Sequence, residues 1–126
     1  MTQSTFDLNA FLADDSNLQD RVLKNMRAKQ AAGIWGLDTR YMKYIKCADG
    51  LEFSAQASEA HYCSPRKNIG PYVSVEIGFP NQPVPEFMQW AEEPDNPTKT
   101  VYGWVPVDVV EHVVNMHGGL HRPQAV

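Results

Sequence analysis

The spacing of apolar residues predicts a helix near the start of the chain. Between Leu18 and Met26 they recur every three or four positions, as on one face of a helix. We expect this helix to span about residues 17–31, with Ser16 as its N-cap and Gly33 just past its end.

The middle of the chain alternates between apolar and polar residues, which is the pattern of half-buried strands. This alternation predicts strands over about residues 41–47, 51–58, 73–78 and 101–105. Asp49-Gly50 lies between the first two and predicts a hairpin with a type I′ turn. In the last strand, Tyr102 and Trp104 are expected to share one face.

Two more helices are predicted in the second half. A group of prolines excludes a central strand after residue 79, and Pro85 suits the first position of a short helix over residues 86–92. A final helix over about residues 107–116 has a stripe of valines and ends at His117-Gly118-Gly119.

This order of elements predicts an α+β fold, in which helices pack on one face of an antiparallel sheet of about four or more strands. With 126 residues, we expect a single domain over residues 1–126. Residues 1–15 would form a variable N-terminal arm, and residues 120–126 a tail. A homodimer would cover the edges and the free face of such a sheet.

Composition and charge exclude several classes of function. The formal net charge of −4 gives no overall field for gripping DNA or RNA. No apolar run approaches the roughly 20 residues that span a membrane, and the N-terminus has no signal-peptide pattern. Cys47 and Cys63 are therefore expected to be reduced thiols in a cytoplasmic protein.

His61 and Cys63 are two residues apart and could form a nucleophile pair or half of a zinc site. Such an isolated pair is more often a buried thiol beside a hydrogen-bonded histidine. The other histidines lie near the last helix, at spacings that form no recognised zinc motif: His112, His117 and His121. We therefore expect no metal site and no catalytic residues.

The charged residues favour an anionic ligand over acid–base chemistry. The acidic run of Glu92, Glu93 and Asp95 is typical of a solvated helix end. Arginine suits phosphate groups because its planar fork binds them bidentately. The candidates are Arg40, Arg66 and Arg122. Arg66 is the strongest of them, because it follows a proline in a loop and so loses less entropy on binding.

Phe79, Asn96 and Thr98 are candidates for recognising a base. Phe79 continues the alternation of its strand, which would place it in the core, yet Gly78 and Pro80 flank it at the strand end, where a ring can line a pocket. Stacking on a base contributes about 1–3 kcal/mol in nucleic-acid systems. Asn96 and Thr98 can hydrogen-bond a purine edge or ribose hydroxyls.

A set of short motifs resembles the phage Thoeris anti-defence family, first type. They are His61-Tyr-Cys-Ser-Pro-Arg66, Gly70-Pro-Tyr72, Glu76-Ile-Gly-Phe-Pro80, Asp95-Asn-Pro-Thr98, Thr100-Val-Tyr-Gly-Trp-Val-Pro106 and His117-Gly-Gly119. Gly36-Leu-Asp-Thr-Arg40 and Gln56-Ala-Ser58 fit the family as well, so the resemblance covers roughly residues 30–120.

The resemblance implies a sponge and not an enzyme. Members of this family bind a glycocyclic ADP-ribose isomer made by bacterial TIR proteins and hold it intact, which blocks the defence effector. The resemblance also implies a homodimer or homohexamer with ligand near subunit interfaces, and in some members a separate site for cyclic oligonucleotides. On this chain it makes Phe79 the stacking residue, Asn96 and Thr98 polar readers, and Arg66 and Arg122 phosphate partners.

Two other functions stay open. The first is a small hydrolase or transferase that acts on a nucleotide signal through Cys63 or His61. The second is a protein–protein interaction module in which Trp90 and Trp104 are the anchors.

Overall fold

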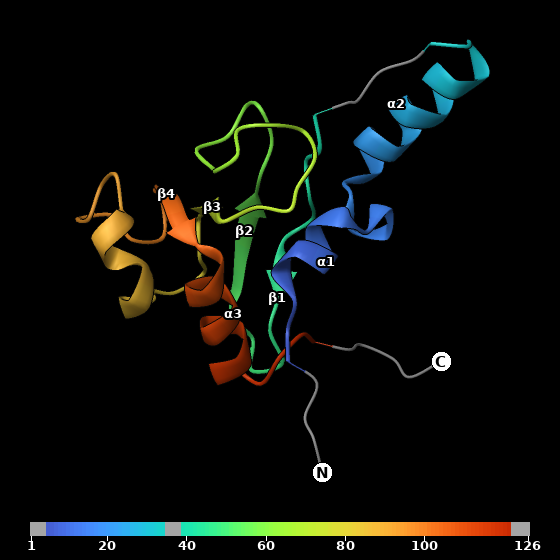
Figure 1. The fold of residues 1–126 in the computed structure, drawn as a ribbon. Coiled ribbons are helices and arrows are strands. Elements are labelled where there is room, and N and C mark those ends of the chain that lie inside the picture. Colours follow the sequence, from blue (N-terminus) through green and yellow to red (C-terminus); the bar gives the residue numbers. More distant parts are fainter. Residues whose placement is uncertain (1–4, 35–38, 122–126) are drawn as a thin grey trace.

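The structure, a computed structural model, describes residues 5–34 and 39–121 (Figure 1). Its centre is a four-stranded antiparallel sheet in the order β1-β2-β3-β4. The strands are β1 (Ile45–Lys46), β2 (Glu52–Gln56), β3 (Ser74–Gly78) and β4 (Val101–Pro106). The helices are α1 (Leu8–Ala13), α2 (Asp20–Ala31) and α3 (Val107–Met116), with the 3₁₀ turns η1 (Asp15–Asn17) and η2 (Pro85–Trp90). The predicted α+β fold with an antiparallel sheet is confirmed.

One face of the sheet carries the core. Ile77 on β3 pairs with Tyr102 on β4, and Val75 pairs with Val105, so these four side chains share a face and are fully buried. From η2, the Phe87 ring packs against Tyr102 with 6.0 Å between ring centroids. Helix α3 adds three more buried side chains: Val110, Val113 and Val114. Burial of these apolar side chains is the main stabilising term of the fold.

The first strand is shorter than predicted. Only Ile45–Lys46 forms β1, although the alternation predicted a strand over about residues 41–47. The Gln56 side-chain amide makes two hydrogen bonds to the main chain of Met42: it accepts from the N–H at 2.8 Å and donates to the carbonyl at 2.9 Å. A side chain of β2 thus takes the place of the strand ladder at this position.

The N-terminal segment belongs to the core. The apolar side chains of Leu8 and Leu12 on α1 are buried, and the Leu8 amide donates to the Glu111 carboxylate on α3 at 2.9 Å. Asp7 caps α1 by accepting from the Ala10 amide at 3.0 Å. Residues 8–13 are therefore a short helix packed on the core, within the segment predicted as an N-terminal arm.

Helix α2 begins later than predicted. Ser16 lies in η1, where it bonds the Asp14 carboxylate, and Gln19 is the N-cap of α2. Gly33 lies just past the helix end with a φ of +72°, as the sequence predicted. Val22 is the one residue of α2 that is buried, and the helix points away from the sheet (Figure 1).

The turn between β1 and β2 is not of type I′. Gly50 has a φ of +102°, but Asp49 does not have the positive φ that this turn type requires at both central residues. The Gly50 amide instead donates to the Cys47 carbonyl at 3.1 Å.

Segments of the same chain cover both edges of the sheet. Next to β1, Leu120 forms an antiparallel bridge with Cys47. Next to β4, Ala91 bridges Tyr102, and the Trp104 amide donates to the carbonyl of Tyr62 at 3.0 Å. The predicted tail thus begins with a residue tied to the sheet, and edge protection does not require a second subunit.

Candidate functional site

Phe79 lies directly after β3, and its ring turns out of the core. Its φ is +50°, in the left-handed region, which costs a non-glycine residue about 1–2 kcal/mol. The regular alternation would place the ring beside Ile77 in the core, but the left-handed backbone leaves Phe79 47% exposed. Its amide donates to the Thr100 carbonyl at 3.1 Å, which fixes this conformation against β4. The core interpretation of Phe79 is therefore wrong.

Asn96 and Thr98 lie in the loop that connects η2 to β4. Asn96 donates to the Glu93 carbonyl and accepts from the Lys99 amide, each at 2.9 Å through its main chain. Asn96 is exposed, and within the described residues its side-chain amide makes no hydrogen bond. This loop leads into Thr100, whose carbonyl accepts from the Phe79 amide, so the exposed ring lies at the same end of the sheet as an exposed loop with acidic and amide side chains.

Trp104 is a second aromatic residue in a left-handed conformation. The β3–β4 register shifts between Val75 and Ile77, and Trp104 in this bulge has a φ of +54°. Its ring is 50% exposed, whereas Tyr102 and Val105 on either side of the bulge are buried. The prediction that Tyr102 and Trp104 share a face is wrong, because the extra residue of the bulge reverses the alternation.

Trp104, Tyr62 and Arg66 form a continuous stack on the surface. The Tyr62 and Trp104 rings stack with 5.0 Å between centroids and 27° between planes. The Arg66 guanidinium carbon lies over the Tyr62 ring, 5.6 Å from its centroid. Gly103 makes the approach of Tyr62 possible, because a Cβ at this position would lie only 3.3 Å from the Tyr62 Cβ.

The candidate arginines differ in whether their guanidinium groups are already bonded to other residues of the chain. Arg40 is engaged by the Asp15 carboxylate at 2.8 Å and by the Leu12 carbonyl. Arg66 is exposed and forms no ion pair with any described residue. Arg122 lies outside the described residues. Arg66 is thus the predicted phosphate partner that the structure can place, and its guanidinium is available to a ligand.

The predicted site residues fall into two groups along β4. Phe79 and the loop with Asn96 and Thr98 lie where β4 begins, and Arg66 lies on the stack with Trp104. Three residues of strand separate the two positions by about 10 Å. Among the described residues, no hydrogen bond or ring contact joins Phe79 to Arg66.

His61 and Cys63 are packed in a way that disfavours nucleophilic chemistry. Both are buried, and the His61 Nδ1 lies 2.6 Å from the Ser58 hydroxyl. The Cys63 thiol donates to the Ser58 carbonyl at 3.2 Å. Burial raises the pKa of Cys63 and lowers the pKa of His61, so both neutral forms are favoured. Within the described residues, no group of three or more metal-binding side chains is clustered.

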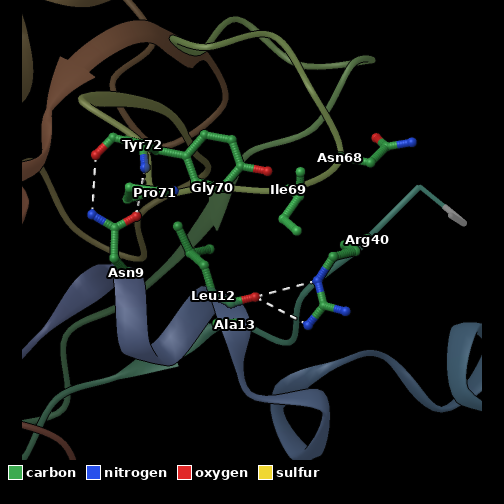
Figure 2. A pocket seen from close by; sticks show the side chains of 9 residues that line it. All are labelled: Asn9, Leu12, Ala13, Arg40, Asn68, Ile69, Gly70, Pro71 and Tyr72. Carbon is green, nitrogen blue, oxygen red and sulfur yellow. Dashed lines mark hydrogen bonds between the residues drawn. The ribbon is translucent and has the colours of Figure 1, made fainter.

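Figure 2 shows a cavity of about 330 Å³ between α1 and the loop before β3, which the sequence did not predict. The Asn9 side chain ties the two walls together by donating to the Tyr72 carbonyl at 3.0 Å and accepting from the Tyr72 amide at 2.7 Å. Arg40 lines the cavity, but Asp15 neutralises its charge. Arg40 is thus a predicted phosphate candidate that lines this cavity, whereas Phe79, Asn96, Thr98 and Arg66 do not line it.

Comparisons of the chain with protein-family models, with curated proteins and with solved structures gave no match. In the described part of the chain, no helix is both long and apolar enough to cross a membrane. The exposed aromatic, amide and guanidinium groups, together with the motif resemblance, are the features that bear on function.

Proposed function

We propose that this protein binds a cyclic ADP-ribose isomer and holds it unaltered, as a phage anti-defence protein in the cytoplasm of an infected bacterium. The observation that supports this most directly is Phe79, an exposed ring held in a left-handed backbone conformation. Such strain persists only where the surrounding structure maintains it, and it is concentrated at binding sites. In the loop that leads to Thr100, the exposed Asn96 amide is available for the edge of a base.

The charge of the ligand fits the arginines. A pyrophosphate-bridged ring carries about two negative charges, which two or three arginines can neutralise even on an acidic chain. Arg66 is exposed and is steadied by its contact with Tyr62. The proposed assembly is the homodimer or homohexamer that the motif resemblance implies, in which each subunit contributes part of the site.

The environment of Cys63 supports binding without chemistry. A nucleophilic thiol needs a lowered pKa and access to the ligand. Cys63 is buried, and its thiol donates to main-chain carbonyls. A hydrolase or transferase would have to use other groups.

The proposal is tested by incubating the protein with a glycocyclic ADP-ribose isomer and measuring the free ligand after ultrafiltration. The protein–ligand mixture is then heated, and the released nucleotide is analysed by mass spectrometry. We expect free ligand to be depleted and the intact isomer to be recovered on heating. Recovery of an altered product would favour the hydrolase, and absence of depletion would favour the interaction module.

Matched variants locate the site. Replacing Phe79 by alanine removes a stacking ring, which corresponds to a loss of about 5- to 150-fold in affinity. Tyr44→Ala is the control, because Tyr44 is also an exposed aromatic but lies on no candidate surface. Equal losses of affinity for both variants would contradict the assignment of Phe79 as the stacking residue. A loss of affinity for Asn96→Ala would support its role in hydrogen-bonding the base.

A further inference from the structure

The Trp104–Tyr62–Arg66 stack has a geometry that leaves one part of the arginine for a ligand. The flat face of a guanidinium is attracted by an aromatic ring, whereas its N–H donors lie in its plane and point outward from its edge. Arg66 lies over the ring of Tyr62 and has no ion pair among the described residues. The guanidinium therefore has an aromatic ring as its neighbour, and none of its N–H donors is bonded to a described residue.

Tyr62 is anchored to the sheet although it belongs to a loop. Its amide donates to the Glu76 carboxylate on β3 at 3.0 Å, and its carbonyl accepts from the Trp104 amide on β4 at the same distance. Its ring is stacked on Trp104 and lies over Gly103, which has no side chain to push it away. The position of the ring is thus set by two neighbouring strands.

The left-handed conformation of Trp104 is part of this arrangement. In a regular strand the Trp104 ring would enter the core between Tyr102 and Val105. The bulge turns it outward, where it forms the base of the stack. The strained backbone is thereby connected to the orientation of a charged side chain on another loop.

We infer that Tyr62 and Trp104 are positioning residues that hold Arg66 with its N–H edge presented to a phosphate group of the ligand. This inference rests on the proposed function and adds the residues that orient its phosphate partner. An arginine held in advance loses less rotamer freedom on binding, which raises affinity. Lysine cannot replace it, because an ammonium has neither a flat face nor a fork.

The test is a double-mutant cycle on the full chain with a glycocyclic ADP-ribose isomer, with dissociation constants measured by titration calorimetry. Tyr62→Leu removes the aromatic face, and Tyr62→Phe keeps it. We expect Tyr62→Leu to weaken binding several-fold, up to about 13-fold, which is the cost of ordering one long side chain on binding. Tyr62→Phe should bind like the parent protein, because within the described residues the Tyr62 hydroxyl has no hydrogen-bond partner.

The decisive measurement repeats Tyr62→Leu in an Arg66→Gln background. If Tyr62 acts through Arg66, the substitution has little further effect there, at most about 2-fold. The same fold-loss in both backgrounds would overturn the inference, since Tyr62 would then act independently of the arginine. Arg66→Lys should lose most of the affinity although it keeps the charge, and full retention would also overturn the inference.

Two controls keep the outcome clear. If Tyr62→Leu does not fold, as judged by circular dichroism, Trp104→Leu removes the base of the stack and enters the same cycle. If the parent protein does not bind the isomer, the proposed function fails and this inference fails with it. If the parent protein binds but the cycle shows no coupling, only the positioning role fails.

Discussion

Because the backbone at Phe79 is left-handed, we expect glycine to be more stabilising than alanine at this position, which is the reverse of the usual order in a strand. In a regular strand, glycine is less stabilising than alanine by roughly 0.5–1 kcal/mol, because its unfolded chain is more flexible. At Phe79, with a φ of +50°, alanine keeps the strain of the left-handed region while glycine does not. We therefore expect Phe79→Gly to be more stable than Phe79→Ala.

The size of the difference follows from two opposing terms. Relief of the left-handed strain favours glycine by about 1–2 kcal/mol, and the flexibility of the unfolded chain favours alanine by about 0.4–1 kcal/mol. The net advantage of glycine is about 0.8 kcal/mol. Both variants lose the same half-exposed ring, so the cost of that loss cancels in the comparison.

Urea unfolding followed by circular dichroism measures this difference. With a slope near 1.5 kcal/mol per molar urea, we expect the Phe79→Gly midpoint to lie about 0.5 M above that of Phe79→Ala, with equal slopes. The matched pair Lys46→Gly and Lys46→Ala, at an exposed position in β1, should show the opposite order. An alanine midpoint equal to or above the glycine midpoint at Phe79 would refute the strain argument.

Further predictions concern the Asp49 carboxylate, the Cys63 thiol and the partly buried Asn9 amide. Hydrogen bonding, foremost from the Leu51 amide, holds the pKa of Asp49 below its usual value. Its contribution to stability is therefore present above the ordinary aspartate pKa and is lost as the pH falls through the lowered pKa, so unfolding midpoints of Asp49→Asn and the parent should converge as the pH falls below about 4. Burial raises the pKa of Cys63, so mass spectrometry should find it alkylated by iodoacetamide far more slowly in the native than in the urea-unfolded protein. Asn9→Ala removes two hydrogen bonds to the Tyr72 backbone and should lower the free energy of unfolding by about 1–3 kcal/mol in urea titrations.

Local patterns were sufficient where an element depends on its own residues. The final helix spans Val107–Met116, as its valine stripe and the following glycines predicted. The strand before it and the short helix after Pro85 also lie close to their predicted positions, although the latter is a 3₁₀ turn. Periodicity and the backbone limits of proline and glycine are properties of short segments, so a sequence displays them directly.

Local patterns failed where a contact from elsewhere in the chain decides the outcome. Ser16 has the chemistry of an N-cap, but it lies inside η1, and Leu18 after it bridges Met42. Leu8 lies in the segment predicted as an N-terminal arm, yet it is buried, and its amide donates to Glu111 on α3. These partners are far away in the chain, and no local spacing identifies them.

The residues of the candidate site show the same contrast between local pattern and distant contact. Their chemical types and positions can be read from the sequence: an arginine after a proline, an aromatic at a strand end, and an amide in a turn-rich loop. Only the tertiary structure decided that Phe79 and Trp104 leave the core, because a side chain's face depends on the register between β3 and β4. It also decided that Arg66 meets Tyr62 on Trp104, since that contact needs a loop to fold over the glycine of a neighbouring strand.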